Sequence, residues 1–130
     1  MKTRTPGKAR KAVKTGKSDV LKRHMAVHLS PELRKKYNTR SLGLRVGDTV
    51  KIMKGKYAKK TGKVEKVNLQ KQRAYIEGLE VSKADGTKAK VSVNTSNLMI
   101  NSLDTGDKWR KKIIERKGGK VEAKKEVAEK

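Results

Sequence analysis

A short segment rich in lysine and glycine is the part of this sequence whose residue types most directly suggest chemistry. It spans residues 54–62 and reads KGKYAKKTG. Its lysines can neutralise phosphate groups, and Tyr57 can stack on an unpaired base. Gly55 and Gly62 permit close backbone approach and unusual dihedral angles. Because lysine makes point contacts, the segment predicts recognition of a phosphate backbone rather than of base sequence. The lysines of this basic loop are Lys54, Lys56, Lys59 and Lys60.

Two other groupings have residue types that metal sites or enzymes use. His24 and His28 lie four residues apart, a spacing that can hold a metal on a helix, but no third ligand is nearby in the sequence. Asp48 with Asp85 or Glu65 resembles a pair of catalytic carboxylates. Both aspartates sit in turns, so we expect neither catalysis nor a bound metal or cofactor. RNA contact or ordinary packing is the better interpretation of the histidines.

The overall charge indicates a polyanionic partner. The chain has 130 residues with 36 Lys and Arg against 13 Asp and Glu, a formal net charge of +23. Such an excess repels itself unless a polyanion neutralises it. No apolar run approaches the roughly 18 residues of a spanning helix, and no signal peptide follows Met1, so nucleic acid is favoured over a membrane. The absence of cysteine excludes disulfides, zinc ribbons and cysteine nucleophiles, and fits an intracellular protein.

The positive charge is concentrated near the N-terminus. Residues 1–40 contain 13 Lys and Arg but only 2 Asp and Glu. Residues 1–17 show no apolar period, and Gly7 and Gly16 are expected to prevent a helix. We therefore predict an arm that is disordered when free and becomes ordered on its partner. The RNA contacts expected from this arm are Arg4, Lys8, Arg10, Lys11 and Lys14.

Residues 18–40 predict a short helical extension. Val20, Leu21 and Met25 share a face if residues 19–29 are helical. Ser30 and Pro31 then provide a cap and a first helical residue for another helix, which is expected to end at Asn38 after two turns. The RNA contacts expected from the extension are Lys22, Arg23, Arg34 and Arg40.

Residues 41–103 have the pattern of short strands. Apolar residues alternate with polar ones around Val50, and the spacing of three between Val64 and Val67 suggests a bulge. About five short strands within about 55 residues favour a small curled sheet or barrel.

Asp85-Gly86 predicts a two-residue hairpin turn within this region. That turn would pair Lys83 with Lys88 and Ser82 with Ala89. Like charges that face each other weaken a free hairpin, so the two lysines suggest a phosphate partner at the hairpin tip.

Residues 104–117 predict a C-terminal helix, followed by a charged tail over 118–130. Trp109, Ile113 and Ile114 recur at helical spacing, and Gly118-Gly119 is expected to end the helix. We expect Trp109 to seal the barrel against this helix, with base stacking as the alternative, and Arg110 to contact RNA.

The segment LRVGDTVKIMKGKYAKKTGKVEKVNL, residues 44–69, is similar to a KOW motif. The longer stretch ELRKKYNTRSLGLRVGDTVKIMKGKYAKKTGKVEKV, with INSLDTGDKWRKKIIERK, resembles the archaeal and eukaryotic form of ribosomal large-subunit protein twenty-four. The resemblance covers roughly residues 8–117 and is nearer to the archaeal form, because a long C-terminal extension is lacking.

This resemblance implies a mainly β, SH3-like barrel with basic extensions, and a structural role in the cytoplasmic large ribosomal subunit. It further implies rRNA binding near the 5′ end, early action in assembly, a position near the peptide exit tunnel, and neighbouring ribosomal proteins as partners. No membrane and no small-molecule substrate are expected. One alternative is a KOW module of a transcription-elongation factor, although that family usually has a separate domain before its KOW repeats. A peptide-binding SH3-like module is disfavoured, because four aromatic residues are too few for an aromatic groove.

Overall fold

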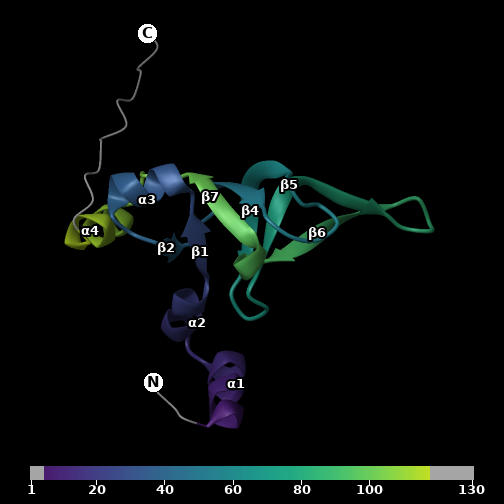
Figure 1. Ribbon diagram of the computed structural model, residues 1–130. Coiled ribbons are helices and arrows are strands. Elements are labelled where there is room, and N and C mark those ends of the chain that lie inside the picture. The colour runs from purple at the N-terminus through teal and green to yellow at the C-terminus, as the bar shows by residue number, and fades with distance from the viewer. Residues whose placement is uncertain (1–4, 118–130) are drawn as a thin grey trace.

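The computed structural model describes residues 5–117, which form a mainly β protein with short helices at both ends (Figure 1). One seven-stranded sheet has the order β2-β1-β7-β3-β4-β5-β6. It curls into a small SH3-like barrel, which confirms the predicted fold class. The strands are β1 (Ala26–Leu29), β2 (Ser41–Gly43), β3 (Thr49–Ile52), β4 (Thr61–Asn68), β5 (Arg73–Ser82), β6 (Lys88–Asn94) and β7 (Leu98–Ser102). The helices are α1 (Pro6–Thr15), α2 (Ser18–His24), α3 (Pro31–Tyr37), the 3-10 helix η1 (Thr95–Asn97) and α4 (Lys108–Arg116).

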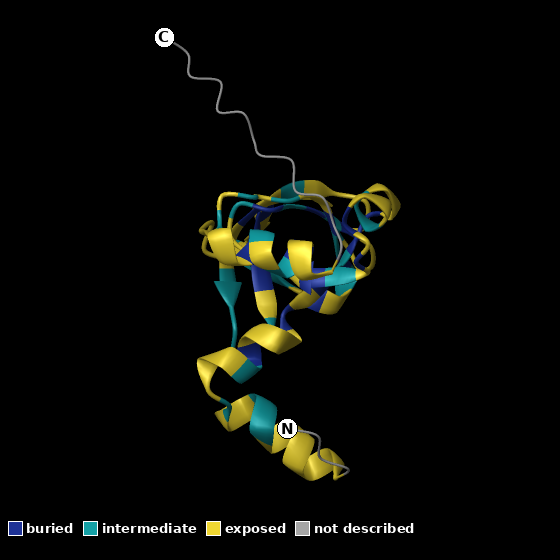
Figure 2. Cartoon of the chain, turned by 90° about the vertical axis from the view of Figure 1, so that its left-hand side faces the viewer, coloured by how far each residue is buried: buried dark blue, intermediate teal, exposed yellow. Residues whose placement is uncertain are grey.

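The core lies inside the curled sheet (Figure 2). β3 and β7 pair antiparallel, and their buried residues alternate with half-buried ones, as a sheet with one face inward requires. Val50, Leu98 and Ile100 are completely buried at this pairing. None of the helices within residues 5–117 is long and apolar enough to cross a membrane.

β1 corrects the expectation of a single helix over residues 19–29. α2 ends at His24, and β1 follows, antiparallel to β2 and parallel to β7. Val27 and Leu29 are buried, whereas Ala26 is exposed and His28 half-buried. Buried and exposed residues alternate here as they do in a strand. The apolar residues just before have helical spacing, which concealed the change from a helical pattern to a strand pattern.

α1 was not expected, and it lies within the N-terminal arm. Pro6 occupies its first turn, where a proline ring is tolerated, and Gly16 is its C-cap. The glycines therefore lie at or near the ends of the helix rather than in its middle, so the expectation that they would prevent a helix was wrong. α1 buries none of its residues, and it projects from the barrel (Figure 2).

The capping residues of α3 behave as predicted. The Ser30 hydroxyl accepts a hydrogen bond from the backbone N–H of Leu33, and Pro31 is the first helical residue. Asn38 ends the helix with a left-handed φ of 46°. Tyr37, the last helical residue, is buried in the barrel core, which places the helix over the sheet.

β4 carries the predicted irregularity. Its register with β5 shifts between Val64 and Lys66, so the two valines at a spacing of three come from a bulged strand. Gly62, near the start of β4, pairs with Val50. A Cβ atom on Gly62 would lie 2.6 Å from Cγ2 of Ile76 and 2.8 Å from the carbonyl oxygen of Glu77. The close approach of β5 therefore requires glycine at this position.

We expect Gly62→Val to lower the free energy of unfolding by about 1–3 kcal/mol, because the side chain would be forced into a packed region. Thermal unfolding followed by circular dichroism measures this change. Gly43→Val is the matched control, since a Cβ atom at that strand position meets nothing within 4 Å. Equal melting temperatures for the two variants would contradict the packing argument.

Candidate nucleic-acid interface

The basic loop, residues 54–62, leads from β3 into the first two residues of β4 and is internally ordered. Its base is closed by two backbone hydrogen bonds, from Ile52 N–H to the Lys60 carbonyl and from Lys59 N–H to the Ile52 carbonyl. Gly55 has a φ of +100°, which favours glycine. Lys59 also has a positive φ, of 70°. All four lysines of the loop are exposed, so the fold presents a cluster of cations on an ordered backbone.

Tyr57 anchors this loop to the barrel. Its side chain is half-buried and packs against the core, and the Nζ atom of Lys60 lies 5.5 Å from the centre of its ring. That geometry is a cation–π contact. Part of the ring surface is therefore already occupied, and the predicted base contact at Tyr57 is restricted to the part that stays exposed.

The β5–β6 hairpin forms a second basic projection, away from α1 (Figure 1). The structure corrects its turn: Ser82 pairs with Lys88, and Lys83 N–H donates to the Thr87 carbonyl. The loop is therefore longer than two residues, with Gly86 at a φ of +79°. The strand pairing therefore differs by one residue from the predicted pairing. Gly86 occupies a left-handed position that follows the turn, not one of the two central positions of a two-residue turn.

The hairpin lysines differ in how far their charges are neutralised. Lys83 is exposed at the turn, whereas the Nζ atom of Lys88 lies 3.9 Å from a carboxylate oxygen of Glu80. Lys90 donates a hydrogen bond to Glu65, and this bond and the charge of that carboxylate raise the pKa of Lys90 above its ordinary value. Asp85 is exposed beside Gly86 and keeps its predicted place in the turn.

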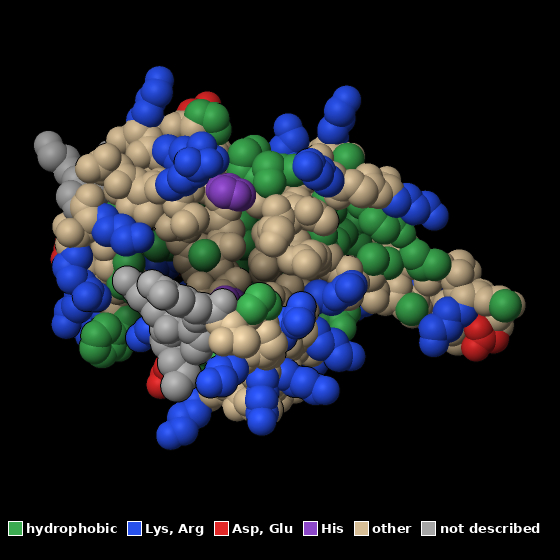
Figure 3. Space-filling model, turned by 60° about the horizontal axis from the view of Figure 1, so that its bottom comes forward, with side chains coloured by type: hydrophobic (Ala, Val, Ile, Leu, Met, Phe, Trp, Pro, Cys, Tyr) green, Lys and Arg blue, Asp and Glu red, His purple; other side chains and the backbone are tan. Residues whose placement is uncertain are grey.

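The N-terminal arm presents its cations along one side of α1. Helical geometry places Ala9, Ala12 and Val13 on the opposite side. Arg4 lies outside the described residues. The exposed cations of α1 are Lys8, Arg10, Lys11 and Lys14. Figure 3 shows lysine and arginine side chains spread over the face that it presents, with few acidic ones among them.

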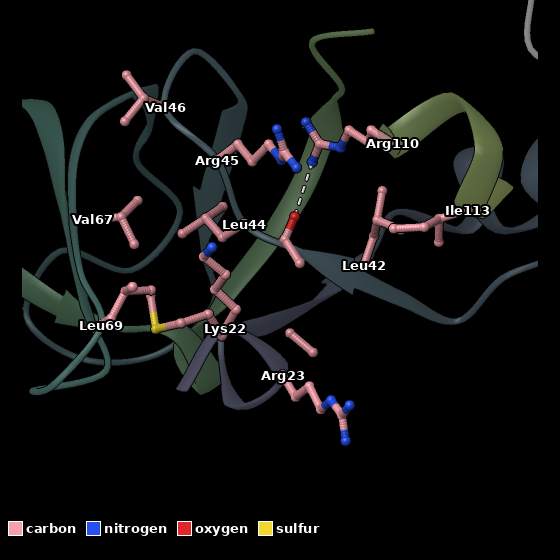
Figure 4. A pocket seen from close by; sticks show the side chains of 13 residues that line it. Lys22, Arg23, Leu42, Leu44, Arg45, Val46, Val67, Leu69, Arg110 and Ile113 are labelled. Carbon is pink, nitrogen blue, oxygen red and sulfur yellow. Dashed lines mark hydrogen bonds between the residues drawn. The ribbon is translucent and has the colours of Figure 1, made fainter. Parts of the chain in front are cut away.

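An apolar groove with a volume of about 780 Å³ lies between α2, the barrel and α4 (Figure 4). Lys22 and Arg23 border it from α2, and Arg45 borders it from the turn before β3. The predicted contacts Lys22 and Arg23 thus stand at the rim of an apolar surface. The remaining residues that line the groove are Met25, Ala26, Leu42, Gly43, Leu44, Val46, Val67, Leu69, Arg110 and Ile113.

Arg34 and Arg40 are placed differently from each other. The Nε atom of Arg34 donates to the Leu29 carbonyl at 2.8 Å, so this half-buried side chain links α3 to β1. Arg40 is exposed before β2, where its carbonyl accepts from Leu29 N–H. Arg40 is therefore the freer of the two for a phosphate.

Arg110 is buried, which argues against the RNA contact that was predicted for it. Its side chain is 2% exposed and forms a bidentate pair with Asp48, with Nη1–Oδ1 and Nη2–Oδ2 distances of 2.6 and 2.7 Å. It also donates to the carbonyls of Asp104 and Gly43. Because 62 residues separate the partners, no local spacing in the sequence indicates this pair.

The prediction that Trp109 seals the barrel was wrong. Trp109 is 66% exposed and does not close the barrel. Its backbone N–H donates to the Asp107 carboxylate at the N-terminus of α4. Arg110 and Ile114 are the buried residues of this helix, so the tryptophan faces outward. The predicted end of the helix at Gly118-Gly119 lies outside the described residues.

The residues considered for metal binding or catalysis do not form a site. Within residues 5–117, no group of three or more histidines and carboxylates is placed to hold a metal ion. Asp48 is paired with Arg110, while Asp85 is at the hairpin turn. Their separation into a buried ion pair and an exposed turn leaves no shared carboxylate centre.

The comparisons with known proteins agree with the resemblance found in the sequence. Residues 3–117 match the model of a ribosomal protein family that comprises the eukaryotic L26 proteins and their archaeal counterparts. The large ribosomal subunit protein uL24 of Sulfolobus acidocaldarius is 41% identical over 112 residues, 86% of this chain and 84% of that protein. The protein of the same name from Korarchaeum cryptofilum is 37% identical over 122 residues, 94% and 93% of the two chains. This chain therefore belongs to the ribosomal protein family of eukaryotic L26 and its archaeal counterparts.

Proposed function

We propose that this protein is a structural constituent of the large ribosomal subunit in the cytoplasm, where it binds rRNA. The observation that carries the proposal is the similarity to archaeal proteins named large ribosomal subunit protein uL24, at 37–41% identity over most of both chains. The family is one of ribosomal proteins, so the role is structural rather than enzymatic. The net charge of +23 is of the sign that an RNA partner requires.

The barrel and its projections suggest how the RNA is held. The basic loop and the β5–β6 hairpin are ordered by backbone hydrogen bonds, so the backbone that carries their lysines is held in position before binding. α1 buries nothing against the barrel, which suits a segment that enters a groove of folded RNA. We infer that the protein recognises the shape of its rRNA through phosphate contacts rather than through a base-by-base code.

The finer parts of the proposal rest on the family resemblance and on the charge distribution. We propose binding near the 5′ end of the large-subunit rRNA, early action in assembly, and a position near the peptide exit tunnel beside other ribosomal proteins. In this proposal, residues 1–17 are the arm that becomes ordered on RNA, and residues 18–40 are an extension of the barrel. Residues 41–103 form the docking barrel, residues 104–117 the C-terminal helix and residues 118–130 the tail.

Co-sedimentation with the large subunit after a high-salt wash tests this function. We expect the full chain to remain bound, because arms that lie between RNA helices cannot leave without loosening the RNA around them. A variant that lacks residues 1–17 should be lost in the wash. Its thermal unfolding should change little, since α1 contributes no buried residue and Lys17 contributes only its backbone carbonyl to the start of α2. Release of the full chain by the wash would contradict a role as a core constituent.

A further inference from the structure

Trp109 is the single tryptophan of the chain, and 66% of its surface is exposed on α4. The other large apolar side chains exposed within residues 5–117 are Val46, Met53 and Val81, which belong to other segments. Trp109 is thus not part of a continuous apolar patch on its helix. A single exposed apolar side chain is common on protein surfaces, so the groups around the ring decide whether it has a partner.

The surroundings of the ring are cationic. The Nζ atom of Lys112 lies 5.2 Å from the centre of the Trp109 ring, in a cation–π contact. Arg116 follows on the same face of α4, seven residues after the tryptophan. Its Nε atom donates to the Lys112 carbonyl, which holds the guanidinium along this face. Among the described residues of α4 only Glu115 is acidic, so the local charge is positive.

α4 holds this face in a fixed orientation. On its buried side Arg110 makes the bidentate pair with Asp48, and Ile114 is in the core. At its start, Asp107 accepts from the Trp109 N–H and is ion-paired with Arg45. A rigid helix loses little freedom when its outer face is covered, which favours binding there.

From this geometry we propose that Trp109, Lys112 and Arg116 form a binding site for one unpaired nucleotide of RNA. The base stacks on the part of the indole that Lys112 leaves exposed, and Lys112 and Arg116 neutralise the adjacent phosphates. The inference rests on the proposed rRNA-binding function and adds to it a single-strand contact on α4. The cationic surroundings favour a nucleotide over an apolar protein surface. Neither Lys112 nor Arg116 was among the contacts predicted from the sequence, although W-x-x-K-x-x-x-R has helical spacing.

Intrinsic fluorescence of the full chain tests the site, because all of its tryptophan signal comes from Trp109. We expect a single-stranded oligouridylate of about ten nucleotides to quench this fluorescence in a saturable way, as a stacked base does. Inorganic polyphosphate has the charge without the base and should leave the signal nearly unchanged. Equal quenching by polyphosphate, or by polyglutamate as an acidic protein surface, would overturn the stacking site.

Variants separate stacking from charge and from folding. Trp109→Ala should weaken binding of the labelled oligouridylate by about 5- to 150-fold, measured by fluorescence anisotropy, whereas Trp109→Tyr should retain most of the affinity. Neither variant should change thermal unfolding, since the side chain is exposed. Unchanged affinity of Trp109→Ala would remove the stacking site but leave the proposed function intact if the full chain still binds its rRNA. Failure of the full chain to bind that rRNA would contradict the proposed function itself.

Discussion

Replacing Asp48 by alanine is expected to lower the free energy of unfolding by about 3–5 kcal/mol, because it leaves the buried guanidinium of Arg110 without its counter-ion. The side chains of Arg110 and Asp48 are 2% and 0% exposed, so water does not replace the lost partner. Asp48 also accepts hydrogen bonds from the backbone N–H groups of Arg45 and Asp104. A loss of this size is a large share of the about 5–15 kcal/mol that typically holds a domain together.

Chemical denaturation followed by circular dichroism measures this loss, and three controls interpret it. Asp85→Ala removes an exposed aspartate at the hairpin turn and should change the unfolding free energy by less than about 0.5 kcal/mol. Asp48→Leu combined with Arg110→Met should cost less than the sum of the two single changes, since no unpaired charge is then buried. Arg110→Lys should cost less than Arg110→Ala because it keeps one charge. Strictly additive single changes would show that the pair is not coupled.

Raising the salt concentration from 50 to 200 mM is expected to weaken binding to an rRNA fragment by about 10³–10⁵-fold if six to ten phosphates are contacted. The structure provides enough exposed cations on the basic loop, the hairpin, α1 and α2 for that number. The slope of log affinity against log salt concentration, obtained from filter binding or anisotropy, gives the number of phosphates contacted. A flat titration would contradict the proposed mode of binding.

A variant with glutamine at all four lysines of the basic loop tests which cations produce this slope. Each lost phosphate contact should reduce the slope by about 0.7–0.9, so we expect a decrease of about 3 if all four lysines contact phosphate. Lys90→Gln is the control, because Glu65 already neutralises that lysine. A decrease for the fourfold variant no larger than that for the single control would show that the loop lysines do not contact phosphate.

The sequence predicted those features that depend on neighbouring residues. The cap at Ser30, the left-handed end at Asn38 and the bulge between Val64 and Lys66 all arise from local patterns, and each is present. Gly62 was expected from its residue type to permit a close approach of the backbone. The structure adds the physical reason, which is the approach of Ile76 and Glu77.

The features that the sequence did not predict depend on distant contacts. Arg110 looks like any other surface cation in the sequence, and only the pairing with Asp48, 62 residues earlier in the chain, reveals that it is buried. Trp109 was expected in the core because large aromatic residues usually pack. It is exposed because the neighbouring Arg110 and the following Ile114 take the inward side of α4. β1 was missed because the helical spacing of the apolar residues before it concealed the change of period, and its pairing with the distant β7 leaves no local signal.

The parallel pairing of β1 with β7 sets an order of events during synthesis. His28 pairs with Met99, 71 residues later, whereas its antiparallel partner Ser41 follows after only 13 residues. At about 5–20 residues per second, roughly 4–14 seconds separate the synthesis of the two strands. The antiparallel pair of β1 and β2, with α3 between them in the chain, can therefore form before β7 has been synthesised. The sheet can be completed only after β7 has been synthesised. The basic N-terminal segment is therefore exposed well before the barrel that follows it has folded.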